Sequence, residues 1–432
     1  MISLFIFLLV FCTVLGLSIL AFSIPFQIKY LNLISYQYFL NFIFLVVPGS
    51  IAILLGFRDD LALYPVRDET VIYTCIAICW CLIAFPTTIT ILDLLLKQNI
   101  KRKLIDYKMK KIVHFNNGDI TKRNVVIVTI FAFFFLVLLM ALLPVIPIFH
   151  VGASAEFIMN SRLESAFDLP PIVYFFRRIL IYFFPIYFIY LFVLKSYLDI
   201  DKKVLFVTFI CTIFILTYST EKAPVVLFIL AIFFAKNLIG KNYSLSIRKI
   251  IPLILIFIVL FVSMFAFFYN NSVGDAKTSL LVRMFVSQIA GSYLSMEYYG
   301  DNAPFKMFHA VLFRLDALLG NIPTMQTSEE LVYYYYPDLY NGNLWRNVNS
   351  FIIQGAWSNF GWVGIIIAPI WCAIVIYLGC LYIVNKPKTA SNLAVYSYSA
   401  IFMASLSTNF NNFIYSSGLL LTIFIWAFLK KL

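Results

Sequence analysis

Eleven apolar stretches constrain the fold of this chain more than any other feature of its sequence. A helix crosses the hydrocarbon core of a bilayer with about 20 apolar residues, and stretches of roughly that length occur at 2–24, 31–56, 71–96, 124–147, 173–194, 204–219, 224–240, 250–269, 351–384, 393–410 and 413–429. Only 12% of the 432 residues are charged and 62% are hydrophobic, whereas about a quarter of a soluble domain is charged. The sequence therefore predicts an all-α polytopic membrane protein with about eleven transmembrane helices.

The net charge is +12, but the basic residues concentrate in loops on one side of the predicted membrane. This distribution gives no reason to expect a nucleic-acid partner. If the basic segment from Lys97 to Arg123 is cytoplasmic, alternation of the spans places 21 of the 32 Lys and Arg residues on the cytoplasmic side and 15 of the 20 acidic residues on the other. Retention of positive charge in the cytoplasm is the usual rule for short loops. We expect the N-terminus outside and the C-terminus in the cytoplasm.

One long segment, about 270–350, is polar enough to lie in water, and this topology places it on the outer side. The chain then divides into residues 1–269 with eight spans, the outer loop 270–350, and residues 351–432 with three spans. Long ordered loops usually have a function. Apolar spacing predicts two short amphipathic helices at the membrane surface within the loop, Thr278–Tyr299 and Pro304–Leu319.

The retention of positive charge in the cytoplasm does not explain the basic side chains on the outer side. A guanidinium group matches the geometry of phosphate or carboxylate. Arg58 and Arg67 have acidic neighbours and are predicted to pair with them, whereas Arg177 and Arg178 lie at the mouth of an apolar helix, where snorkelling to lipid headgroups is the alternative reading. The candidate anion-binding residues are Arg162, Arg177, Arg178, Lys222, Arg283, Arg314 and Arg346.

Acidic and aromatic residues of the same outer segments suit sugar chemistry. A hydroxyl acceptor needs a general base, and the candidates are Glu221, Glu164, Asp316 and His309; Glu221 and Lys222 could instead neutralise each other in their tight hairpin. The run Tyr333–Tyr340 is dense in tyrosines, of which Tyr335 and Tyr336 are candidates for packing on sugar rings, although interfacial anchoring explains them as well. The cysteines are scattered through apolar runs, so neither a disulfide framework nor a metal site is predicted, and no nucleotide motif suggests a cofactor.

The segment from Asn343 to Gly364 combines amides and glycines at a membrane edge, where a broken helix is tolerated only if it lines a cavity or is enclosed by protein. Here Asn349, Phe351 and the run Trp357-Ser-Asn-Phe-Gly-Trp-Val-Gly364 resemble the O-antigen or oligosaccharide repeat-unit polymerases, the Wzy-type family. The number of spans and the late outer loop resemble that family over nearly the whole chain. Two departures are that Gln354 and Gly355 stand where relatives often have a Glu, and that spaced Arg–Gly motifs are not reproduced around Arg162 or Arg346.

This resemblance implies a GT-C-like, metal-independent glycosyltransferase in the bacterial inner membrane. It would polymerise undecaprenyl-pyrophosphate-linked oligosaccharides into surface polysaccharide such as the O-antigen of lipopolysaccharide, with membrane lipids around it and a chain-length regulator as a further partner. An O-antigen ligase would use the same donor and architecture. A flippase or exporter of lipid-linked sugars would need charges within the spans, and a polytopic sensor or scaffold would tolerate loss of the outer arginines.

Overall fold

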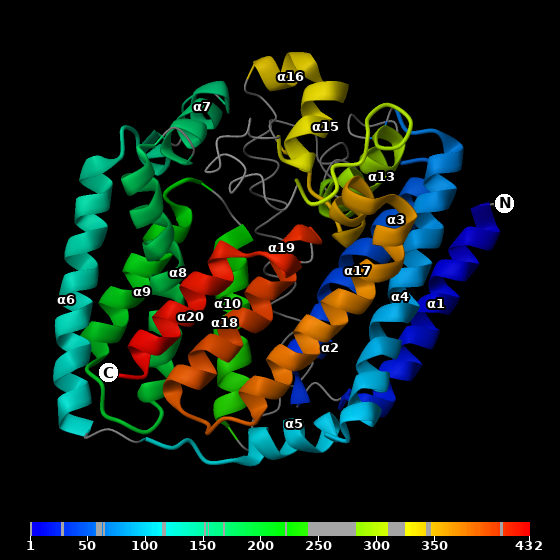
Figure 1. Ribbon diagram of the computed structural model, residues 1–432. Coiled ribbons are helices and arrows are strands. Elements are labelled where there is room, and N and C mark those ends of the chain that lie inside the picture. Colours follow the sequence, from blue (N-terminus) through cyan, green and yellow to red (C-terminus); the bar gives the residue numbers. More distant parts are fainter. Residues whose placement is uncertain are drawn as a thin grey trace. The chain divides into compact units, whose positions relative to one another are not determined.

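The computed structural model of the chain is helical throughout the part that it describes, with an isolated bridge between Tyr299 and Ala303 and no sheet there (Figure 1). The described residues are 2–26, 30–57, 63, 65–114, 118–150, 153, 155–166, 169–220, 223–240, 282–309, 325–342, 347–406 and 409–432.

Among these residues, seven helices are long and apolar enough to cross a membrane, which supports the prediction of a multi-pass helical membrane protein. They are α1 (Ile2–Ser23), the continuous run α2 (Leu33–Gln37), η2 (Tyr38–Val46) and α3 (Val47–Leu54), α4 (Asp68–Leu96), α6 (Gly118–Leu142), α8 (Pro171–Leu194), α17 (Ile352–Val384), and α19 (Asn411–Ile414) with α20 (Ser417–Leu429). All seven coincide with predicted spans.

Three further predicted spans are helices in the structure, but shorter ones. They are α9 (Lys202–Thr217), α10 (Ala223–Ile239) and α18 (Ala390–Leu406), of 16, 17 and 17 residues. The remaining predicted span, 250–269, lies outside the described residues, as do residues 270–281, 310–324 and 343–346 of the predicted outer loop.

The chain divides into two compact units, each made of three separate stretches of sequence. Unit 1 comprises Met1–Lys103, Ser244–Leu381 and Met403–Tyr415. Within it α1 and α4 lie side by side (Figure 1), and Tyr38 Oη of η2 donates to the carbonyl of Leu82 in α4 at 2.7 Å. A Cβ added at Gly16 of α1 would lie 2.1 Å from Tyr38 Oη. A small residue at such a crossing lets membrane helices approach closely.

Unit 2 comprises Leu104–Tyr243, Tyr382–Phe402 and Ser416–Leu432. Its central helix is α8, which contacts α6, α9, α10 and α20 and has buried residues on most of its circumference beyond Phe184. Tyr187 Oη of α8 donates to the carbonyl of Val125 in α6 at 2.9 Å. The short helices η3 (Pro147–His150) and α7 (Ala155–Ala166) precede α8, and α5 (Ile100–Met109) connects the two units along the chain.

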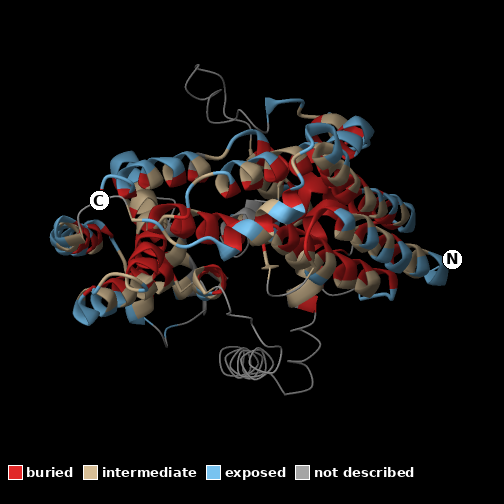
Figure 2. Cartoon of the chain, turned by 90° about the horizontal axis from the view of Figure 1, so that it is seen from below, coloured by how far each residue is buried: buried red, intermediate tan, exposed pale blue. Residues whose placement is uncertain are grey.

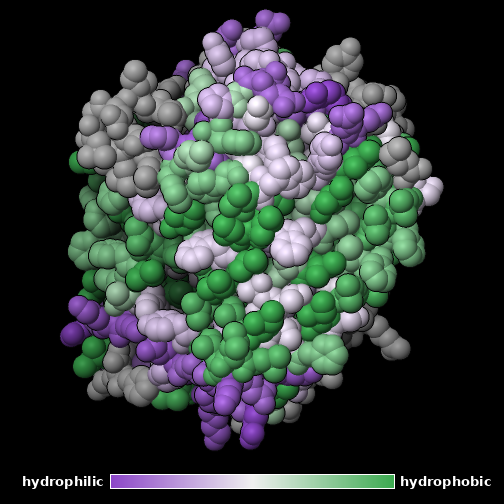
Figure 3. Space-filling view, turned by 45° about the vertical axis from the view of Figure 1, so that its right-hand side comes forward, coloured by the Kyte–Doolittle hydropathy of each residue, from purple (hydrophilic) through white to green (hydrophobic). Residues whose placement is uncertain are grey.

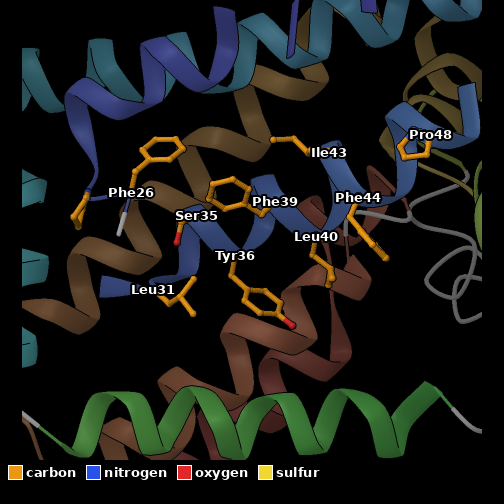
Figure 4. A pocket seen from close by; sticks show the side chains of 10 residues that line it. Phe26, Leu31, Ser35, Tyr36, Phe39, Leu40, Ile43, Phe44 and Pro48 are labelled. Carbon is orange, nitrogen blue, oxygen red and sulfur yellow. The ribbon is translucent and has the colours of Figure 1, made fainter. Parts of the chain in front are cut away.

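Helices α1 and α6 expose large apolar side chains along one side, as expected for surfaces that face lipid. Phe7, Phe131 and Phe134 are more than half exposed. Figure 2 shows the exposed and buried sides of the helices. On the face shown in Figure 3, hydrophobic residues cover the middle of the helices and hydrophilic residues gather toward their ends.

Of the two amphipathic surface helices predicted within the long loop, the first does not lie at the surface, and most of the second lies outside the described residues. The first is η4 (Val282–Val286) followed by α13 (Ser287–Tyr298), but every residue from Ile289 to Tyr298 is buried, so this helix lies within unit 1 and not on its surface. Its serines make this possible because they bond inside the unit: Ser292 Oγ lies 3.1 Å from Ser350 Oγ, and Ser295 Oγ donates to the carbonyl of Gln354. Of the second predicted helix, residues 304–308 are not helical and 310–319 lie outside the described residues.

Candidate functional site

Helix α17 is broken at Gly361, inside the motif that resembles the polymerases. Gly361 has φ 56° and ψ −136°, a conformation open to glycine and costly for other residues. The carbonyls of Ser358 and Asn359 just before the break accept the backbone N–H groups of Lys306 and Met307, at 2.8 and 3.1 Å. The predicted broken helix is confirmed, and its freed carbonyls are bonded by a segment of the long loop.

Polar side chains fill the first turns of α17 before this break. Asn359 Nδ2 donates to the carbonyl of Gly355 at 2.6 Å and to Asn411 Oδ1 at 2.7 Å. Asn359 is fully buried and Gln354 is 1% exposed, yet Asn359 Oδ1 and Gln354 Nε2 have no hydrogen-bond partner among the described residues. Buried amide atoms without a partner are rare because they cost free energy. They mark this part of unit 1 as a place where water or a polar ligand would be stabilised.

An ion-pair cluster lies at the N-terminal end of α4. The buried carboxylate of Glu297 accepts the backbone N–H of Arg67 at 3.0 Å and its Nε at 2.5 Å, and Arg67 Nη2 donates to Asp301 at 2.6 Å. These hydrogen bonds, to Asp301 first and then to Glu297, raise the pKa of Arg67 above its ordinary value. Arg67 does pair with acids, but these are distant in sequence and not the neighbouring acids that were predicted. Arg58 lies outside the described residues.

A second ion pair in unit 1 joins two segments of the long loop. Lys306 Nζ pairs with Glu330 of α15 (Thr327–Tyr335) and donates to the carbonyl of Met325 at 2.6 Å. The Lys306 side chain is 8% exposed and that of Glu330 is 23% exposed. Nearby, Trp357 Nε1 of α17 donates to the carbonyl of Tyr299 at 3.0 Å. The described parts of the loop are therefore packed on the broken helix.

Tyrosines form an aromatic cluster beside these ion pairs. The rings of Tyr298 and Tyr334 have centroids 4.5 Å apart. Burial and the charge of Glu330 raise the pKa of Tyr298 to about 12, and burial raises the pKa of Tyr336 to about 12. Tyr333 and Tyr334 are 51% and 48% exposed, whereas the predicted sugar-binding pair Tyr335 and Tyr336 is only partly exposed. The sequence pattern located the aromatic run, but not which rings of α15 face outward.

Two of the predicted anion-binding residues meet at one turn of unit 2. Arg162 Nε of α7 donates to the carbonyl of Ser219 at 2.8 Å. Arg177 Nε of α8 donates to Tyr218 Oη, and the Arg177 guanidinium carbon lies 5.6 Å from the centroid of the Tyr218 ring. Tyr218 and Ser219 form the turn that leads to α10. We refer to Arg162, Arg177, Tyr218 and Ser219 as the arginine cluster.

The third arginine of this region, Arg178, lies over the ring of Tyr174 at 5.7 Å from its centroid. Among the described residues, neither Arg162 nor Arg178 forms an ion pair with a carboxylate. Guanidinium groups of this kind keep N–H donors and positive charge available to an anion.

The other candidate residues are more dispersed. Glu164 is exposed on α7, two residues after Arg162, and His309 is exposed in unit 1. Asn349 donates to Gln288 Oε1 at 3.2 Å, and its carbonyl accepts the N–H of Gly291. Arg283 lies in η4, with its side chain outside the description, and five candidates lie wholly outside the described residues: Glu221, Lys222, Arg314, Asp316 and Arg346.

The described part of the chain contains no group of three or more His, Cys, Asp and Glu residues that could hold a metal ion. Seven cysteines are free thiols. No protein-family model matches the chain, and no curated protein or solved structure matches it either.

Proposed function

We propose that this protein is a membrane glycosyltransferase that polymerises undecaprenyl-pyrophosphate-linked oligosaccharide repeat units into surface polysaccharide at the outer leaflet of the bacterial inner membrane. The observation that supports the proposal most is the arginine cluster, in which Arg162 and Arg177 come from different helices to one turn beside the end of α8. A lipid pyrophosphate leaves with its negative charge close to the membrane interface, the kind of place where such a cluster would act.

The proposed reaction needs only protein side chains. An acceptor sugar hydroxyl would attack the anomeric carbon of the growing glycan, the bond from that carbon to the pyrophosphate oxygen would break, and a carboxylate would take the hydroxyl proton. Arg162 and Arg177 would stabilise the charge that develops on the leaving pyrophosphate. Glu164, on α7 with Arg162, is the described acidic candidate nearest in sequence to the cluster, and Glu221 follows the Tyr218–Ser219 turn along the chain.

The tyrosine cluster of unit 1 would serve the sugars. Pyranose C–H faces pack on aromatic rings, and Tyr333 and Tyr334 offer half-exposed rings beside Glu329 and Glu330. In this proposal the chain has about eleven spans in a GT-C-like arrangement, with its N-terminus periplasmic, its C-terminus cytoplasmic and the long loop in the periplasm. The broken helix α17 would hold that loop in place.

Deletion of the gene followed by electrophoresis of surface polysaccharide tests the reaction. A polymerase predicts loss of the ladder with a single repeat unit still attached to lipid A. Accumulation of finished polymer on the lipid carrier would identify a ligase instead, and an intact ladder would refute both.

Complementation with arginine variants tests the site. Replacement of Arg177 by Ala should lower the yield of polymer about 100-fold, the order of effect seen when one stabiliser of developing charge is removed, and Arg177→Lys should restore part of it. Arg123→Ala is the matched control, because Arg123 is exposed on α6 in the predicted cytoplasmic segment. If Arg177→Ala, at normal abundance in the membrane, supports a full ladder, the cluster does not bind the leaving group.

A further inference from the structure

A second polar site lies in unit 2, away from the arginine cluster, and the proposed function does not use it. It is a cavity of about 300 Å³ whose lining includes His114, Tyr190, Leu194, Lys386, Asn392 and Lys430. Two of these residues are lysines, and none of the described residues that line it is acidic. We refer to this cavity as the lysine pocket.

Two aromatic rings bring the lysines together. Lys386 Nζ lies 4.7 Å from the centroid of the Tyr382 ring, and Lys430 Nζ lies 3.5 Å from the centroid of the Trp426 ring. The two rings pack edge to face with centroids 6.1 Å apart. Cation–π contacts of this type stabilise ammonium groups without neutralising them. The pocket therefore holds two positive charges close to each other.

This arrangement is built into the fold. Trp426 Nε1 donates to Asn392 Oδ1 at 2.8 Å, and Asn392 Nδ2 donates to the carbonyl of Pro387 at 2.6 Å, so α18 fixes the ring beneath Lys430. The segment before α18 is fixed as well, because the buried Lys388 donates to the carbonyls of Lys108 and Lys110. Partial burial and the charge of Lys386 lower the pKa of Lys430, as expected for ammonium groups that repel one another.

The start of a helix and a histidine complete the lining. The N-terminus of α18 opens on the pocket through Thr389, Ala390 and Ser391, where a helix favours negative charge. His114 also lines the pocket, and its buried Nε2 atom has no hydrogen-bond partner among the described residues. Two ammonium groups, a helix N-terminus and an imidazole nitrogen form a set of groups that suits the oxygens of a phosphate.

The apolar part of the lining points to the source of that phosphate. Tyr190 and Leu194 lie at the C-terminal end of α8, and Leu429 is the last residue of α20, so the pocket lies where two membrane-spanning helices end. A free anion would gain nothing from these side chains, whereas the glycerol and first methylenes of a phospholipid would pack on them. Basic and aromatic residues at the ends of membrane-spanning helices favour the binding of anionic lipid headgroups.

We infer that the lysine pocket binds the phosphate group of an anionic phospholipid headgroup. The site would hold a lipid of the leaflet opposite the arginine cluster if α8 spans the bilayer, since Arg177 and Leu194 lie near opposite ends of that helix. This inference does not depend on the proposed glycosyltransferase activity.

Binding of dioctanoyl phosphatidylglycerol to the full-length protein in a neutral detergent tests the inference, with dioctanoyl phosphatidylcholine and inorganic phosphate as the other arms. Phosphatidylglycerol should bind at least about tenfold more tightly than phosphatidylcholine. Lys386→Gln/Lys430→Gln should weaken its binding about 30-fold, the effect of two lysines at about 1 kcal/mol each near a membrane surface. Lys386→Arg/Lys430→Arg should bind nearly as well as the wild type.

The matched control is Lys202→Gln/Lys431→Gln, which removes the same charge from exposed residues that do not line the pocket. It should change the affinity less than about threefold in 0.15 M salt. An equal loss in the control would mean a diffuse electrostatic effect and would overturn the site. Saturable binding of inorganic phosphate that depends on Lys386 and Lys430, with no preference between the two lipids, would overturn the lipid assignment.

Discussion

At the scale of single residues, the break in α17 depends on Gly361. Its φ of 56° and ψ of −136° exclude most side chains, and a Cβ added there would lie 2.9 Å from the Phe305 ring. Phe305 in turn packs edge to face on Trp357 at 5.7 Å between centroids. The glycine therefore sets both the backbone break and the close approach of the long loop.

We predict that Gly361→Ala destabilises the protein by about 1–3 kcal/mol, the cost of holding a residue with a side chain in such a conformation. Thermal unfolding of the detergent-solubilised protein measures it. Gly379→Ala in the same helix is the control, because nothing lies within 4 Å of an added Cβ there and Ala is the better helix former. Equal effects of the two substitutions would mean that the break does not need glycine.

The sequence could predict that α17 breaks, because amides and glycines at a membrane edge are a local signal. It could not predict the partners of the charged residues. Arg67 was expected to pair with an acid near it in sequence, and in the structure it pairs with Glu297, 230 positions away. Only the tertiary fold brings them together. The orphaned amide atoms of Gln354 and Asn359 were missed for the same reason.

At the scale of elements, hydropathy located every long helix of the described chain, because each must be apolar along its whole length to lie in lipid. The same reading was wrong for α13. Its mixture of small, polar and apolar residues has an amphipathic spacing, but the helix is enclosed by η2, α3, α4 and α15. Periodicity cannot reveal enclosure by elements that are distant in sequence.

The partly buried ion pair between Lys306 and Glu330 should be a main support of the described loop segments. Replacement of Lys306 by Met would leave Glu330 without its cation in a site where it is 23% exposed. We expect a loss of about 2–3 kcal/mol of unfolding free energy, somewhat below the cost of breaking a fully buried pair. Chemical or thermal unfolding in detergent would measure the loss.

Lys122→Met provides the comparison for that experiment. Lys122 lies 4.0 Å from Asp119, and the two side chains are 42% and 94% exposed. Its removal should change stability by less than about 0.5 kcal/mol, as is usual for exposed pairs. A Lys306→Met protein as stable as Lys122→Met would show that the loop segments do not rely on their ion pair.

At the scale of the whole molecule, the distribution of charge along the chain predicts which side of the membrane each loop faces. The two ends of helix α4 allow this orientation to be tested. The Arg67 end of α4 is bonded to Glu297 and Asp301 of the long loop, and its other end leads into the basic segment that begins at Lys97. If α4 spans the bilayer, these two ends face opposite sides. Positive charge retained in the cytoplasm then places Asp301 outside and Lys110 inside.

Single cysteines at these positions should therefore react differently in intact cells. Asp301, whose side chain is 66% exposed, and Lys110 are both accessible in the structure, so exposure alone would make both reactive. Asp301→Cys should react with a membrane-impermeant maleimide, and Lys110→Cys should react only after the membrane is permeabilised. The native cysteines lie within apolar helices, and the unsubstituted protein gives the background. The opposite labelling pattern would place the long loop and the arginine cluster in the cytoplasm, where the polymerisation of surface glycans does not occur, and the proposed function would be refuted with the orientation.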